Sequence, residues 1–291
     1  MLKTVYVVGN FKMLVTGLFS IFHQDNNLFT FGDLFYLGDL DSFVLASSAS
    51  QVKYNIVLYV FTIDGDTSEY VKNAEKVADL MEWSIRKVDI RTKHFISQIK
   101  KLLGAIEVTQ KRDLAFYYAM MECLSEVSEA YLLCGAGLDA IGGLSKIYQK
   151  EHRANPARFH STRLDYLASD PTPTTLRRLE DEFGKVICAP FLTFRRTSEY
   201  FMSRDWRQLN VDEKSGRVML KASLRDAYHD RIKRRGLIAT YTDAFKTSGL
   251  DKLVNEILKS RAINFNFRRR LIELFVDWRL RRIEKQRLEQ T

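Results

Sequence analysis

The chain has 291 residues, with 45 lysines and arginines against 36 aspartates and glutamates, and a formal net charge of +9. Its 46% hydrophobic and 12% aromatic content excludes a disordered chain, and only four prolines and fourteen glycines exclude collagen-like or linker-like sequences. Three widely spaced cysteines argue against a disulfide framework or a structural zinc site and are typical of a reducing compartment. No stretch reaches the about 18 apolar residues of a membrane span, so we expect a cytoplasmic protein with no membrane partner.

Strands and helices alternate along the first half of the chain. Residues 1–30 mix short apolar runs with polar breaks and are interpreted as an N-terminal extension. The run Leu34 to Leu37 predicts a strand, residues 38–42 a tight turn, and Phe43 onward a helix. The almost continuous apolar run from Asn55 to Phe61 predicts a strand buried on both faces of a parallel sheet.

The alternation continues to about residue 135. Thr67, Ser68 and Glu69 offer an N-terminal cap for a helix reaching Met81. The following elements are predicted as a strand, two helices and a strand at residues 84–90, 95–103, 114 to about 129, and 130–134. This order predicts an α/β fold with a doubly wound parallel sheet, in which ligands bind at the carboxyl ends of the strands.

The second half has a different pattern. Residues 31–155 are interpreted as a nucleotide-binding α/β core, and residues 156–291 as a helical C-terminal part that completes the same domain. Prolines at positions 156, 171 and 173 predict a loop or domain joint between about residues 155 and 175. Beyond it, helices are predicted at residues 176–183, 194–202, 222–237 and from about 267.

Two glycine-containing turns follow buried strands, the first at residues 37–42 (Leu-Gly-Asp-Leu-Asp-Ser) and the second at residues 134–143 (Cys-Gly-Ala-Gly-Leu-Asp-Ala-Ile-Gly-Gly). Such a turn directs backbone N–H groups toward an anion at the helix N-terminus. A carboxylate such as Asp41 beside polyphosphate is explained chiefly as a ligand of Mg²⁺. The alternative for the first turn is a hairpin, or a helix whose N-cap is an aspartate. Two such turns can converge on one ligand.

The paired turns resemble the signatures of the asparagine synthetase family, in its synthetase domain, an ATP pyrophosphatase of the PP-loop type. The family's Ser-Gly-Gly-x-Asp-Ser is matched at Gly38, Asp41 and Ser42, and its Ser-Gly-x-Gly-x-Asp-Glu at Gly135, Gly137 and Asp139. Weaker similarities follow in the family's order, at residues 190–192 (Pro-Phe-Leu), 221–225 (Lys-Ala-Ser-Leu-Arg) with the basic residues 231–235, and 270–278. The resemblance covers the chain from about residue 30 to its end.

The resemblance implies an enzyme that activates a carboxylate with ATP as an acyl-adenylate, releases pyrophosphate, and forms an amide or related C–N bond as an amine displaces AMP. The implied nucleotide-binding residues are Leu37, Gly38, Asp39, Asp41, Ser42, Gly135 and Gly137. Asp41 and Asp139 would hold Mg²⁺, and Lys221 would stabilise charge on the phosphates and on the tetrahedral intermediate. Such chemistry depends on positioning and charge stabilisation.

The chain departs from the family pattern at several positions. Leu37 replaces the first serine of the pyrophosphate loop, Asp39 its second glycine, and Ala140 the acidic residue after the second aspartate. The family's glutaminase begins with a cysteine directly after the initiator methionine, whereas Leu2 follows here. We therefore expect ammonia, if it is the amine, to come from a separate glutaminase subunit or from solution.

Two interpretations of these departures stay open. Either the chemistry persists on a changed substrate, or the domain is a degenerate relative that binds nucleotide or nothing. Retention of Asp41, Asp139 and Lys221 favours activity. Cys134 also has two interpretations, as a thiol made acidic by the nearby helix N-terminus or as an inert replacement for serine.

The C-terminal segment is strongly basic. From Lys259 onward there are ten lysines and arginines against four acidic residues. This excess predicts a nucleic-acid partner bound through phosphate contacts, or a solvated helix face with internal ion pairs. With a nucleic-acid partner, a PP-loop enzyme that modifies a nucleobase or tRNA becomes an alternative function.

Overall fold

The computed structural model describes residues 31–51, 55–106, 111–138, 172–193 and 241–254, together with Asn155, Arg158, Ser161 and Glu199. The bounds of the elements, in chain order, are β1 Phe31–Phe35, α2 Leu40–Gln51, β2 Asn55–Ile63, α3 Glu69–Met81, β3 Ser84–Ile90, the 3₁₀ helix η1 Thr92–His94, α4 Phe95–Ala105, α5 Lys111–Glu126, β4 Tyr131–Cys134, α9 Thr172–Phe183, β5 Val186–Cys188, α10 Pro190–Thr193 and α15 Tyr241–Thr247.

The strands of the described residues form one five-stranded sheet in the order β3-β2-β1-β4-β5, and every pair is parallel. Phe35 at the end of β1 lies beside Tyr59 of β2 on one side and Cys134 of β4 on the other. The chain runs outward from β1 through β2 to β3, then returns to add β4 and β5 on the other side of β1. This return creates a topological switch point, the place where the carboxyl ends of β1 and β4 lie side by side.

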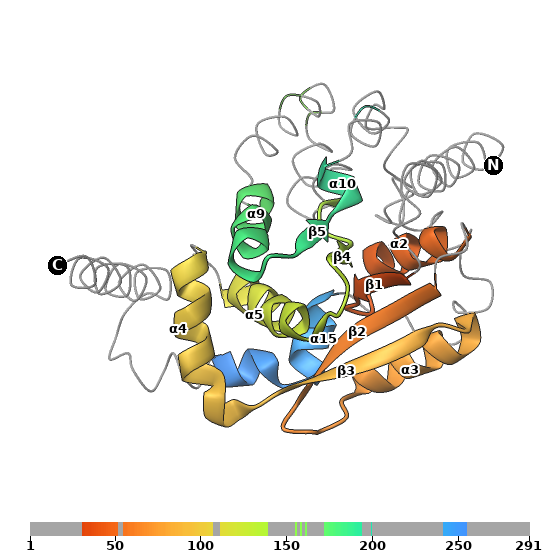
Figure 1. Cartoon of the computed structure of the whole chain (residues 1–291). Coiled ribbons are helices and arrows are strands. Elements are labelled where there is room, and N and C mark those ends of the chain that lie inside the picture. Colours follow the sequence, from red (N-terminus) through yellow and green to blue (C-terminus); the bar gives the residue numbers. More distant parts are fainter. Residues whose placement is uncertain are drawn as a thin grey trace.

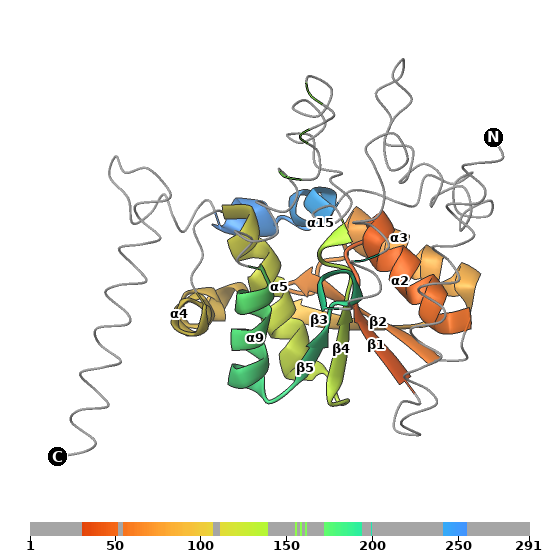
Figure 2. The same ribbon diagram turned by 90° about the horizontal axis from the view of Figure 1, so that it is seen from above.

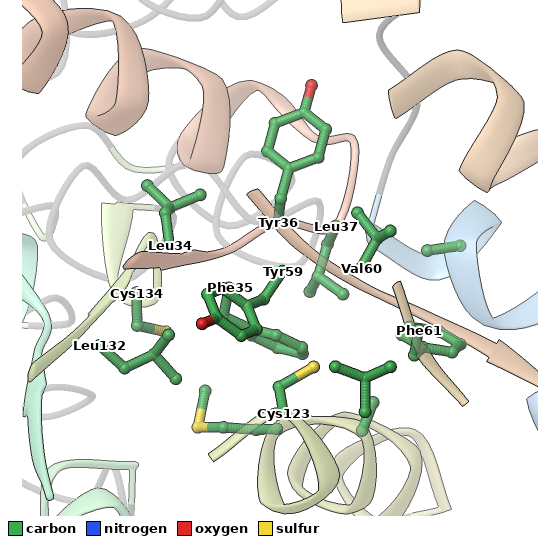
Figure 3. Packing of buried hydrophobic residues seen from close by; sticks show 14 of the residues in the cluster. Leu34, Phe35, Tyr36, Leu37, Tyr59, Val60, Phe61, Cys123, Leu132 and Cys134 are labelled. Atoms are coloured by element: carbon green, nitrogen blue, oxygen red, sulfur yellow. The ribbon is translucent and has the colours of Figure 1, made fainter. Parts of the chain in front are cut away.

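Helices cover both faces of this sheet (Figures 1 and 2). α2 contacts β1, β2 and β4, and α3 contacts β2 and β3, whereas α5 lies on the opposite face beside α4 and α9. Consecutive side chains at the end of β1 and just after it enter the two layers. Phe35 packs edge-on against Phe116 of α5, with ring centroids 5.7 Å apart, and Tyr36 points to the other face (Figure 3). The architecture is therefore an α/β fold compatible with the predicted doubly wound arrangement.

One cluster of buried apolar side chains fills both layers and extends from Leu34 in β1 to Val254 beyond α15. Phe245 of α15 stacks on Phe61 of β2, with ring centroids 5.9 Å apart. The segment around residue 245 thus packs on the carboxyl end of β2, so the segments at the two ends of the described chain share one core.

Most elements of the first half lie close to their predicted positions, but β1 spans Phe31–Phe35 and not the predicted Leu34 to Leu37. The strand at residues 84–90 and the helix at residues 69–81 have the predicted bounds, and the hydroxyl oxygen of Ser68 accepts a hydrogen bond from the backbone N–H of Val71 at 3.4 Å, as the predicted cap requires. The first helix begins at Leu40 and not at Phe43, because Asp39 provides its cap. α5 ends at Glu126, three residues before its predicted end.

Two predictions for the second half are wrong. The expected loop to residue 175 gives way at Thr172 to α9, and Pro173 is tolerated because it lies in the first turn, where a backbone N–H has no helical partner. β5 lies in a range for which only helices were predicted. The ammonium of Lys185, just before β5, donates to the carbonyl oxygens of Val127 and Glu129 at 2.8 and 2.9 Å and so ties this strand to the start of β4.

The extension at residues 1–30 and the helices predicted at residues 222–237 and from about 267 lie outside the described residues, as does the predicted helix at 194–202 except for Glu199. Within the described ranges, no helix combines the length and the apolar character needed to cross a bilayer.

Candidate functional site

The first glycine turn leaves β1 at the switch point. The backbone N–H of Tyr36 still donates to the carbonyl oxygen of Tyr59 at 3.0 Å, and Gly38 then turns the chain with a φ of +74°, a conformation that glycine adopts without strain. A methyl group added at Gly38 would lie 3.6 Å from the ring of Tyr70. The hydroxyl of Tyr70 donates to the carbonyl oxygen of Tyr36. Tyr70 therefore supports this turn from α3.

The second glycine turn packs directly on the first turn of α2. A methyl group added at Gly135 would lie 2.8 Å from the backbone nitrogen of Ser42 and 2.9 Å from the carbonyl carbon of Asp41. Both are backbone atoms, so only glycine allows the turn after β4 to approach α2 this closely. The two turns named by the sequence analysis thus meet at the switch point.

A third segment reaches the same place. A methyl group added at Gly137, whose φ is +102°, would lie 2.3 Å from Cγ of Leu192 in α10. The neighbouring Phe191 is fully buried in the core. The Pro-Phe-Leu sequence at residues 190–192 therefore lies against the second glycine turn.

The N-terminus of α2 is capped by the carboxylate of Asp39. Oδ1 of Asp39 accepts a hydrogen bond from the backbone N–H of Ser42 at 3.0 Å, and the carbonyl oxygen of Asp39 accepts one from Phe43 at 3.2 Å. This is the N-cap arrangement, in which a side-chain oxygen satisfies an N–H of the first helical turn. Asp41 follows in that turn and is 9% exposed.

Backbone N–H groups at helix N-termini commonly bind phosphate, and here the N–H of Ser42 donates to the carboxylate of Asp39. The backbone of Gly135 packs close to the same nitrogen. Asp41 adds a carboxylate of the kind that binds Mg²⁺. Among the described residues, no group of three histidine, cysteine or acidic side chains could hold a metal ion.

Two tyrosines beside the first turn were not identified by sequence analysis. Burial raises the pKa of both Tyr36 and Tyr70, and the negative charge of Asp39 adds to the effect on Tyr36. Within the part of the chain that the structure describes, the hydroxyl of Tyr36 has no hydrogen-bond partner. Tyr70 lies four residues before Ala74 and therefore on the buried face of α3. This helical spacing is the sequence signal that could have identified it.

Cys134 is a buried free thiol. It is 1% exposed, and burial raises its pKa to about 12, with a smaller opposing effect of a hydrogen bond from the backbone of Ala136. Figure 3 shows Cys134 on the side of the sheet that faces α5. The hypothesis of an acidic thiol is therefore not supported, because burial disfavours the charged thiolate and raises the pKa of Cys134.

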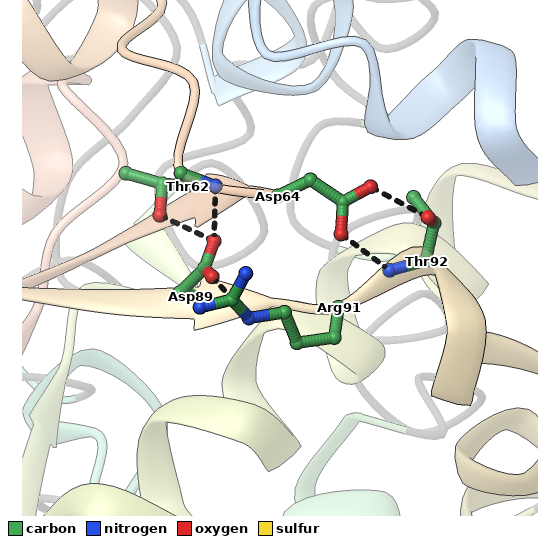
Figure 4. Close-up of polar contacts among 6 residues, drawn as sticks. Thr62, Asp64, Asp89, Arg91 and Thr92 are labelled. Carbon is green, nitrogen blue, oxygen red and sulfur yellow. Dashed lines mark hydrogen bonds and ion pairs between the residues drawn. The ribbon is translucent and has the colours of Figure 1, made fainter.

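A polar network fixes the neighbouring carboxyl ends of β2 and β3 (Figure 4). Oδ1 of Asp89 accepts hydrogen bonds from the hydroxyl of Thr62 at 3.0 Å and the backbone N–H of Gly65 at 2.7 Å, and its Oδ2 pairs with Arg91 at 2.6 Å. Asp64 similarly accepts two hydrogen bonds from Thr92. These carboxylates hold the turn after β2 and are engaged within it.

The structure brings together most of the predicted site and leaves part of it undescribed. The predicted residues that lie at the switch point are Leu37, Gly38, Asp39, Asp41, Ser42, Gly135 and Gly137. Asp139 and Lys221 lie outside the described residues, as does the basic segment from residue 259 onward. The predicted meeting of Asp41 and Asp139 therefore stays a prediction.

Comparison with known proteins adds no assignment: no protein-family model matches the chain, and a search of curated proteins finds no match.

Proposed function

We propose that this protein is an ATP-dependent ligase resembling the synthetase domain of asparagine synthetases, with the PP-loop ATP pyrophosphatase variant of the α/β fold. The observation that carries the proposal is the contact of Gly135 with the backbone of Ser42, which joins the two signature turns at the switch point of the sheet. Nucleotides bind at this position in open parallel sheets, with phosphate at a helix N-terminus.

In the proposed reaction a carboxylate oxygen of the substrate attacks the α-phosphorus of ATP, and the bond to the bridging oxygen breaks to release pyrophosphate. An amine then attacks the acyl carbon, and AMP leaves as the amide or related C–N bond forms. Backbone N–H groups at the start of α2 would bind phosphate oxygens, and Gly38 and Gly135 would let the two turns approach the phosphates. Lys221 would balance the developing negative charge.

Asp41 and Asp139 would hold Mg²⁺, which supplies positive charge that neutralises the phosphates. Asp41 lies in the first turn of α2, directly before Ser42, whose N–H defines the anion position. This placement supports a role for the Asp41 carboxylate near the phosphate chain. It also identifies Asp41 as a residue to substitute in testing the proposal.

The test is calorimetric titration with a non-hydrolysable ATP analogue, with and without Mg²⁺, followed by a pyrophosphate-release assay with candidate acids and amines. We expect Mg²⁺-dependent binding that falls at least tenfold in Asp41→Asn and in Asp139→Asn. Asp79→Asn, an exposed carboxylate on α3, is the matched control and is expected to bind as the wild type does. Binding of the analogue that is unchanged in both site variants would refute the assignment.

One observation favours a second candidate. Asp39 stands where the family has glycine, and its carboxylate accepts the hydrogen bond of the Ser42 N–H that a phosphate would use. This is expected of a degenerate relative that does not catalyse. The basic C-terminal segment of such a protein would bind nucleic acid. This candidate predicts no thermal shift with ATP, and salt-sensitive RNA or DNA binding that weakens when Arg268, Arg269 and Arg270 are replaced by alanine. A PP-loop enzyme acting on a nucleobase or tRNA would show both nucleotide and nucleic-acid binding.

A further inference from the structure

Asp33, in the middle of β1, is an acidic side chain buried in the core. Side chains alternate along a strand, so Asp33 lies on the same face of the sheet as Phe35, which packs against Phe116 of α5. Asp33 is only 4% exposed, and within the described residues its Oδ2 atom has no hydrogen-bond partner. A buried carboxylate with an unpaired oxygen is costly when it is ionised, because its charge has lost the surrounding water.

The neighbouring strands supply two polar groups on the same face. In the register of the sheet, Tyr59 of β2 lies beside Phe35, and Arg86 of β3 lies beside Tyr59. Figure 3 shows Tyr59 next to Phe35. The side chain of Tyr59 hydrogen-bonds to both Asp33 and Arg86, and Glu126 at the end of α5 also acts on Arg86. The positive charge of Arg86 has a smaller effect on Asp33 than burial does.

The connection between α5 and β4, residues 127–130, is bound to Asp33. The backbone of Glu129 hydrogen-bonds to the Asp33 carboxylate, while the negative charge of the Glu129 side chain opposes ionisation of Asp33. Lys185, just before β5, donates to two carbonyl oxygens of the same connection. Asp33 and Lys185 thus both hold the segment that leads into β4.

The protonation state of Asp33 is coupled to this connection. Burial raises the pKa of Asp33 and the charge of Glu129 adds to the effect, whereas the hydrogen bonds and Arg86 lower the pKa by less. The ionised form is therefore disfavoured while the connection is in place. When the connection opens, water reaches the carboxylate and restores its ordinary pKa. By linkage, opening becomes more favourable as the pH rises from that ordinary pKa through the raised one, and no further change follows above it.

We propose that Asp33 is a pH-dependent latch, which holds the connection between α5 and β4 closed when its carboxyl group is protonated and loosens the connection when it is ionised. The latch lies on the α5 face of the sheet and works independently of the proposed nucleotide site.

The experiment is native-state hydrogen exchange of the full chain, followed by NMR from about pH 3 to pH 8, a range that spans the ordinary carboxyl pKa. The amide of Glu129 reports opening of the connection, and the amide of Ile106, which donates to the carbonyl oxygen of Leu102 at 2.9 Å, is the reference. Each opening constant is corrected for intrinsic exchange, and the carboxyl carbon signal of Asp33 gives its pKa. Asp33→Asn cannot ionise, and Asp79→Asn, an exposed carboxylate on α3, is the matched control.

We expect the opening constant at Glu129 to rise about tenfold for each unit by which the pKa of Asp33 exceeds its ordinary value, and to level off above that pKa. This rise should be absent in Asp33→Asn and unchanged in Asp79→Asn, and Ile106 should open more rarely than Glu129 throughout. An opening constant at Glu129 that does not change with pH in the wild type, or that equals the constant at Ile106, overturns the latch. Titration of Asp33 at its ordinary pKa does the same, and the wild type alone provides these results if Asp33→Asn fails to fold.

Discussion

Replacing Gly135 by alanine tests the contact on which the candidate site depends. The φ of Gly135 is not positive, so alanine can adopt its backbone conformation. The obstacle is space: the added methyl group would lie 2.8 Å from the nitrogen of Ser42 and 2.9 Å from the carbonyl carbon of Asp41. Since these are backbone atoms of a helix, neither can rotate away.

Two opposing effects set the magnitude. Alanine reduces the conformational freedom of the unfolded chain and by itself would raise the free energy of unfolding by about 0.4 to 1 kcal/mol. Overpacking in a fixed environment lowers that free energy by about 1 to 3 kcal/mol. The steric effect is the larger, and the two ranges combine to a net loss of about 0 to 2.6 kcal/mol, with a central value of about 1.3 kcal/mol.

Urea denaturation followed by circular dichroism measures this loss. Gly65→Ala is a useful comparison, because nothing lies within 4 Å of its added methyl group and its cost comes only from a φ of +80°. Both variants should be less stable than the wild type, but only Gly135→Ala should also weaken pyrophosphate binding, because it displaces the first turn of α2. A Gly135→Ala protein as stable as the wild type, or more stable, would contradict the close approach of the two turns.

Three further predictions follow from other contacts. Gly137→Ala should cost more stability in the wild type than in a Leu192→Ala background, with a coupling energy of about 0.5 to 3 kcal/mol in a double-mutant cycle, and additive effects would exclude the clash. Burial raises the pKa of Asp33, so its ionised form is disfavoured in the folded state, and stability should fall as pH rises from the unfolded pKa through the folded one. Asp33→Asn should therefore gain stability relative to the wild type as the pH rises above the unfolded pKa of about 4, and the opposite trend in thermal melts would show that the sign is wrong. Lys185→Met should lower the free energy of unfolding by about 1 to 3 kcal/mol through its two lost hydrogen bonds, against less than about 0.5 kcal/mol for the exposed Lys76→Met, and similar urea midpoints for the two would refute this.

The sequence predicted β2, β3 and β4 closely because each has a strong local signal, whereas β1 begins three residues before the predicted run and ends at Phe35. The apolar run of β2 is long enough to be distinguished from a helix segment by its β-branched and aromatic residues, and Ser68 provides an N-cap that marks the start of α3. Alternation of these elements was enough to predict a parallel sheet. The order of the strands, with β4 beside β1, depends on contacts between distant segments and is not encoded in any local pattern.

The elements that were missed owe their structure to tertiary contacts. β5 has three residues, too few to display a periodicity, and pairs along its length with β4. α15 is short, and its placement follows from the stacking of Phe245 on Phe61. Neither contact can be deduced from the residues of the element itself.

The candidate site was predicted as a pattern of glycines and aspartates, but the part played by Asp39 was not. The sequence analysis considered an aspartate as metal ligand or as N-cap, and the structure shows Asp39 as the cap of α2, with Asp41 inside the first turn. The distinction depends on where the helix begins, a boundary that sequence patterns define only to within a few residues. Tyr70 was missed because it supports the turn at Gly38 from α3, and this contact joins two segments that are distant in the sequence.

The position of β1 at the centre of the sheet has a consequence for how the protein is made. Among the described strands β1 is the first to leave the ribosome, but β4, which completes its second edge, follows only after α5 has been synthesised. Until then one edge of β1 lacks its partner strand, and its closure requires a long-range contact, which is slow to form. We therefore expect nascent chains truncated before residue 131 to engage chaperones or aggregate, and chains extended through β5 to become resistant to protease.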